Sequence, residues 1–220
     1  MKTFQDLQEG VYDPNILKAF FLAGGPGSGK SYVVKRGTGG LGLKIVNSDD
    51  TFEKYIKDAG LSMKMPKSEE EPRDKLRDRA KALTKKKLGN YVDGRLGLIV
   101  DGTGKDYDKI AKQATQLKQL GYDVHMIFVN TSLETALKRN AKRDRTVPRS
   151  IATKSWKTVQ SNMGKFSQYF RQNFIVVDNN DSDEDVMGPV FKQVRALAKK
   201  KVQNRTGQQW IAMELQKKKR

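Results

Sequence analysis

The chain has 220 residues, 36% of them hydrophobic and 31% charged, which suits one α/β domain with a lean core. It has no cysteine and a single histidine, His125, so disulfides, thiolate metal sites and most histidine-based catalysis are excluded. The 43 basic residues outnumber the 25 acidic ones and give a net charge of +18. That excess predicts a polyanionic partner, with nucleic acid favoured over a membrane surface, although a solubility adaptation or a basic tail is the alternative.

No apolar run approaches the roughly 20 residues that a membrane span needs, and the first residues lack the apolar stretch of a signal peptide. We therefore expect a cytoplasmic protein without membrane contact.

The first predicted strand, residues 19–23, leads into a glycine-rich loop and a helix at 30–35. The loop reads Gly24, Gly25, Pro26, Gly27, Ser28, Gly29, Lys30, Ser31 and matches G-x-x-x-x-G-K-[ST] between a strand and a helix, the context that this motif requires. The motif predicts that backbone amides at Gly25, Gly27, Ser28 and Gly29 cradle the phosphates of ATP. Lys30 is expected to reach the β and γ phosphates, and the Ser31 hydroxyl to hold Mg²⁺.

The next two strands, residues 43–47 and 96–101, each end near an acid. Since parallel strands end at one edge of such a sheet, Asp49 and Asp101 are both expected to face the γ phosphate. A kinase needs one carboxylate to deprotonate the attacking hydroxyl and another for the metal. We assign Asp49 as the general base and Asp101 to Mg²⁺, whereas Asp50 is expected to cap the helix at 50–58.

The middle of the chain predicts helices at 73–88 and 107–120 and a strand at 123–130, after an exposed, mobile loop at 62–72. A helix at 133–143 follows and places Arg139 and Arg143 four residues apart on one face. We interpret residues 138–150 as a helical lid whose arginines close over the triphosphate; a solvated helix face is the alternative. Catalysis is thus assigned to Asp49, Lys30 and Arg143.

The last third predicts a helix at 151–171, a fifth strand at 174–178 and a helix at 184–200. Residues 132–172 hold ten lysines and arginines against two acids, so much of the positive charge lies here. Strands alternating with helices predict a doubly wound, five-stranded parallel sheet of the P-loop kinase class, in the order 2-3-1-4-5. We expect one domain over residues 1–200 and a basic tail over 201–220 that packs, frays or binds a partner.

Three stretches together resemble the kinase domain of the phage polynucleotide 5′-kinase family: residues 24–31, then Asn47 to Asp50, then 138–143 before Val147 and Pro148. The resemblance covers about residues 18–160. It implies Lys30 and Ser31 on ATP, Asp49 as base, Asp101 near the metal and Arg143 on the phosphates, with Arg139 in the same matched run.

The chain departs from that family where an arginine supports substrate binding after the acidic pair, since Phe52 follows Thr51 here. It is also similar to phage DNA kinases that phosphorylate hydroxymethylated pyrimidine bases. Phe52 is a candidate for stacking on a base, with a core position as the alternative.

The leading hypothesis is an ATP-dependent kinase acting on a hydroxyl of nucleic acid, DNA favoured, either at a hydroxymethylated base or at a 5′ end. The alternatives are a small-molecule kinase, resembling zeta toxins or the kinases of nucleosides and shikimate, and a nucleotide-gated binding or packaging factor. The sequence does not indicate an oligomeric state.

Overall fold

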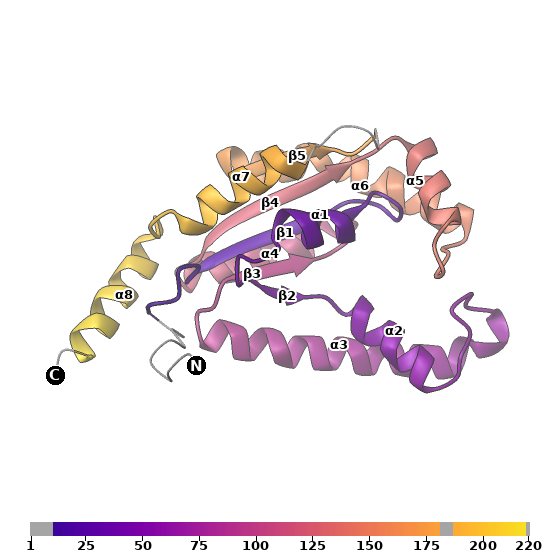
Figure 1. Cartoon of the computed structure of the whole chain (residues 1–220), viewed down its shortest axis with the longest axis horizontal. Coiled ribbons are helices and arrows are strands. Elements are labelled where there is room, and N and C mark those ends of the chain that lie inside the picture. The colour runs from indigo at the N-terminus through magenta and orange to yellow at the C-terminus, as the bar shows by residue number, and fades with distance from the viewer. Residues whose placement is uncertain (1–10, 181–186, 219–220) are drawn as a thin grey trace.

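The computed structural model describes residues 11–180 and 187–218, and its strands form a parallel sheet in the order β2-β3-β1-β4-β5 (Figure 1). This confirms the predicted class and strand order. The strands are β1 Lys18–Ala23, β2 Lys44–Val46, β3 Leu98–Asp101, β4 Asp123–Asn130 and β5 Phe174–Asp178.

Helices cover both faces of the sheet because its central strands are apolar on both sides. On one face, Phe20 and Leu22 of β1 pack with α1 and α7; on the other, Ala19 and Phe21 pack with α4 and α6. These helices are α1 Lys30–Gly37, α4 Tyr107–Gln119, α6 Arg149–Phe170 and α7 Met187–Lys199. The predicted start of α7 at residue 184 lies outside the described residues.

Beyond the β2 edge, α2 (Asp49–Asp58) and α3 (Glu70–Asp93) pack around a small cluster of Phe52, Ile56 and Ala80. Phe52 is only 1% exposed and Arg77 lies over its ring, so Phe52 is a core residue and the stacking role is wrong. The α3 helix is the longest, at 24 residues, and is strongly charged. None of the described helices has the length and apolar character needed to cross a bilayer.

The segment expected as a loop at 62–72 is partly helical, with a 3₁₀ turn at Lys67–Glu69 and α3 starting at Glu70. Pro72 misled the prediction. It is the third residue of α3, where a backbone N–H has no partner within the helix in any case, so proline is tolerated there.

The helix α5 (Leu133–Ala141) ends earlier than predicted, so Arg143 lies beyond it and does not share a helix face with Arg139. Asn140 explains the ending, because its buried side-chain amide donates to the Val147 carbonyl (2.7 Å) and accepts from the Val147 N–H (3.2 Å). These two bonds hold the connection between α5 and α6, residues 142–148, which we call the α5–α6 loop.

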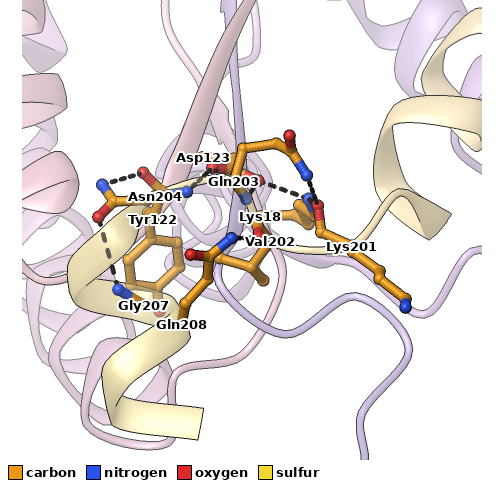
Figure 2. Close-up of polar contacts among 9 residues, drawn as sticks. All are labelled: Lys18, Tyr122, Asp123, Lys201, Val202, Gln203, Asn204, Gly207 and Gln208. Atoms are coloured by element: carbon orange, nitrogen blue, oxygen red, sulfur yellow. Dashed lines mark hydrogen bonds and ion pairs between the residues drawn. The ribbon is translucent and has the colours of Figure 1, made fainter. Parts of the chain in front are cut away.

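Much of the segment expected as a tail forms a helix, α8 (Arg205–Lys217), at the end of the sheet opposite the glycine-rich loop (Figure 1). Figure 2 shows what holds it: the carboxylate of Asp123 accepts from the Lys18 ammonium (2.6 Å) and from the backbone N–H groups of Gln203 and Asn204 (both 2.9 Å). Asn204 in turn caps α8 by accepting from the Thr206 N–H. Lys18 is buried, and the described residues offer it this one carboxylate.

Candidate active site

The backbone of the loop between β1 and α1 adopts the positive φ angles that its glycines predict. Gly27 has φ of 79° and Gly29 has φ of 90°, a region that other residues rarely adopt. A Cβ atom at Gly27 would collide with the Ala136 carbonyl of α5, and one at Gly29 with the side-chain amide of Asn179. The loop therefore needs glycine both for its conformation and for its close packing against α5 and the end of β5.

A cavity of about 180 Å³ lies over this loop, at the N-terminus of α1. Two segments distant in sequence supply its walls. Three of the lining side chains are cationic, those of Lys30, Arg139 and Arg143. The other lining residues are Gly25, Gly27, Gly29 and Ser31. The structure thus brings together the predicted nucleotide-binding residues except Ser28. That residue is buried and does not line the cavity.

Lys30 lies at the centre of the charges in this site. Its ammonium donates to the Gly24 carbonyl at 2.6 Å. Burial lowers the pKa of Lys30, while the carboxylates of Asp101 and Asp49 act in the opposite direction. Burial likewise raises the pKa of Asp101, and the Lys30 charge partly offsets that rise. The two predicted acids therefore lie close enough to Lys30 to interact with it, although they come from different strand ends.

Asn47 forms a hydrogen bond with each of the two acids. Its side-chain amide donates to Asp101 at 3.0 Å, and its side-chain oxygen accepts from the Asp49 backbone N–H at 2.7 Å. The second bond takes up a free amide at the start of α2, whose N-cap residue is Ser48. Asp50 is exposed in the first turn and is not the cap, so that prediction is wrong. The Asp49 side chain is 47% exposed and therefore open to solvent.

The family model described as zeta toxin matches residues 6–187, which is most of the chain. The chain belongs to the zeta toxin family. It is therefore a P-loop phosphotransferase, as the glycine-rich loop predicts. The zeta toxin family is the one that the sequence analysis gave as an alternative. The family match does not show the resemblance to phage polynucleotide kinases, which stays a prediction. No curated protein matches the sequence.

Solved structures share the fold at low identity. A protein of Chloroflexus aurantiacus assigned as a kinase aligns with a TM-score of 0.60 and 16% identity over 81% of this chain and 96% of its own. The AvrRxo1-ORF1:ORF2 complex with ATP aligns at 0.61 and 15% identity, over 82% of this chain and 57% of that one. A chain of the Pnkp1/Rnl/Hen1 RNA repair complex aligns at 0.54 and 19% identity, over 74% and 49%. This zeta toxin family member thus spans about half the length of the last two.

Two residues of this zeta toxin family member were missed by the sequence reasoning. Asn179, just after β5, donates to the Ser28 carbonyl at 2.8 Å and accepts from Arg139 at 2.6 Å through its own carbonyl. Its position at a strand end, like that of Asp101, was an available signal. Arg145 forms an ion pair with Asp49 at 3.1 Å, and nothing distinguished it from the other cations of its basic run.

Proposed function

We propose that the protein is an ATP-dependent kinase that transfers the γ-phosphoryl group to a hydroxyl on nucleic acid, with DNA favoured. The observation that carries the kinase assignment is the cavity in which Lys30, Arg139 and Arg143 surround a glycine-rich loop, with Asp49 interacting electrostatically with Lys30. Three cations around a glycine-rich loop at the N-terminus of a helix suit a triphosphate.

In this proposal the acceptor hydroxyl donates its hydrogen bond to the Asp49 carboxylate and passes its proton there as the oxygen attacks the γ phosphorus. The bond between that phosphorus and the oxygen of ADP breaks. Lys30, Arg139 and Arg143 stay on the phosphate oxygens and stabilise the charge that develops there.

Ser31 and Asp101 would hold Mg²⁺. Ser31 is exposed at the cavity, and Asp101 is kept in place by Asn47. The described residues contain no cluster of three or more histidines, cysteines or acids suited to a metal. That sparse donor set fits Mg²⁺, which binds through one or two protein groups, substrate phosphates and water. The ion would neutralise phosphate charge.

The proposed polyanionic acceptor rests on α6, which follows the α5–α6 loop. This helix of 22 residues has no acidic residue. Its side chains line a hollow of about 740 Å³ on the surface, formed by Arg149, Lys154 and Lys157 with the hydroxyls of Ser150, Thr153 and Thr158. We call these six residues the α6 hollow. Cations interleaved with hydroxyls suit the phosphates of a polynucleotide, whose reacting base or 5′ end would enter the site beside Asp49.

A small-molecule acceptor is the second candidate, and membership of the zeta toxin family favours it. A second hollow, of about 430 Å³, lies between Lys64 and the α5–α6 loop and supports this candidate. It is lined in part by Leu137, Val147 and Pro148, and it has the size and apolar character of a site for an activated sugar or a nucleoside.

Transfer of labelled phosphate from γ-labelled ATP separates the candidates. A covalently closed circular DNA with hydroxymethylated bases tests base acceptors, and a linear DNA with 5′-hydroxyl ends tests end acceptors. An activated amino sugar and nucleosides test the second candidate. We expect the wild type to label DNA and Asp49→Asn to label it far more slowly, at a small residual rate. Label confined to small molecules would refute the nucleic-acid part.

The α6 hollow has its own test. The double variant Lys154→Ala, Lys157→Ala is expected to weaken DNA binding. The binding constant should also fall less steeply with salt, as expected for the loss of up to about two phosphate contacts. The matched control is Lys85→Ala, Lys86→Ala, which removes the same charge from exposed positions on α3. Equal losses in both variants would show that only net charge matters.

A further inference from the structure

Arg145, in the α5–α6 loop, makes an end-on, two-point contact with Asp49, which lies 96 positions earlier in the chain. Its Nη2 lies 3.1 Å from Asp49 Oδ2, and its Nη1 lies 3.5 Å from Asp49 Oδ1. The Arg145 side chain is only 11% exposed. Both oxygens of the proposed base thus face one guanidinium that is held in a fixed place.

The face of α2 that receives Arg145 is built from three residues. Glu53 accepts from Arg145 Nε at 3.2 Å, and the Phe52 ring lies 6.0 Å from the guanidinium carbon. Asp49, Phe52 and Glu53 stand at positions i, i+3 and i+4 of one helix, so they form a continuous surface. One arginine therefore meets two acids and the rim of an aromatic core, which fixes its planar fork more firmly than a single surface pair would.

Stability alone does not account for this arrangement. Asp49 is 47% exposed and Glu53 is 32% exposed, so solvent screens both acids although they share one arginine. The contact nevertheless places the α5–α6 loop, whose Arg143 lines the phosphate cavity, directly against the proposed base. One short loop thus reaches both the nucleotide side and the acceptor side of the site.

We propose that Arg145 is a positioning residue that aligns the Asp49 carboxylate for proton transfer. Each carboxylate oxygen keeps a second lone pair, so Asp49 still accepts the hydrogen bond of an acceptor hydroxyl while Arg145 holds it. This inference rests on the proposed function, because the role of Asp49 belongs to that proposal.

The test compares Arg145→Ala and Arg145→Lys with the wild type, with Arg195→Ala as control. Arg195 is exposed on α7, so its loss removes the same side chain away from the site. We expect Arg145→Ala to lower kcat by about 10- to 100-fold and to change KM for ATP by less than about 2-fold, since a misaligned base slows chemistry and not binding. Arg145→Lys should recover part of the rate, because one ammonium can hold one carboxylate. Melting temperatures check that each variant is folded.

A double variant identifies the partner through which Arg145 acts. If Arg145 works through Asp49, Asp49→Asn with Arg145→Ala is no slower than Asp49→Asn alone, whereas independent effects would multiply. Multiplying losses would overturn the inference, as would an unchanged kcat in folded Arg145→Ala. A raised KM for ATP at unchanged kcat would also overturn it and assign Arg145 to the nucleotide. Full activity of Asp49→Asn would instead refute the proposed base itself.

Discussion

The buried His125 makes the stability of this protein depend on pH. The side chain lies in β4, is 5% exposed and stacks on Phe20 with ring centroids 5.0 Å apart. Burial lowers the pKa of His125 from 6.5 to about 4. Asp123 raises this pKa and Lys18 lowers it, each by less than burial does. The folded state therefore resists protonation, whereas the unfolded state takes up a proton as the pH falls below about 6.5.

Stability attributable to His125 is thus present at neutral pH and is lost as the pH falls from about 6.5 towards about 4. Between pH 7 and pH 5 the linkage relation gives a loss of about 2 kcal/mol, and the full difference in pKa corresponds to about 3 kcal/mol. Urea unfolding at both pH values, followed by the fluorescence of Trp156 and Trp210, measures the free energy of unfolding. Other groups titrate in the same range, so the readout is the difference from His125→Leu, which lacks the proton site. Equal losses on acidification in the two proteins would refute the reasoning.

Three further predictions follow from single contacts. Gly27→Ala should abolish ATP binding measured by calorimetry, since its Cβ would meet the Ala136 carbonyl of α5; unchanged affinity would contradict the loop geometry. Asp123→Asn should lower the free energy of unfolding in urea by about 3 to 5 kcal/mol, because it leaves the Lys18 charge buried without its carboxylate, and a loss below about 1 kcal/mol would argue against that. Asn179→Ala should weaken ATP binding by about 5- to 10-fold, about the effect of one lost hydrogen bond to the Ser28 carbonyl, while leaving KM for the acceptor unchanged.

The fold was predictable because its signals are local. Each strand is an apolar run with turn residues at its ends, and parallel strands separated by helices permit few topologies. The errors lie at element ends, where a tertiary contact decides. Asn140 stops α5 by bonding to Val147, and the carboxylate of Asp123 holds the segment that leads into α8. An N-cap at Asn204 was a usable signal for α8, because asparagine favours that position.

The candidate site was predictable to the extent that strand ends converge. The glycine-rich loop is one contiguous motif, and Asp49 and Asp101 follow neighbouring strands, so topology alone brings them near Lys30. Phe52 shows the limit of this reasoning. Its helical spacing with Ile56 fits a core residue as well as a stacking platform, and only the packing of α3 over the ring made the choice.

The sheet, the glycine-rich loop and the two acids near Lys30 could all be predicted from the sequence, because each depends on a short pattern along the chain. The tertiary structure decided that Asn179 holds Ser28, 151 positions away, and that Arg145 holds Asp49, 96 positions away. Such pairs leave no periodic or local trace, since a hydrogen bond depends on where two side chains meet in space and not on their separation in sequence. The positive charge behind the proposed polynucleotide acceptor was visible in composition, whereas the grouping of Arg149, Lys154 and Lys157 around one hollow on α6 came from the fold.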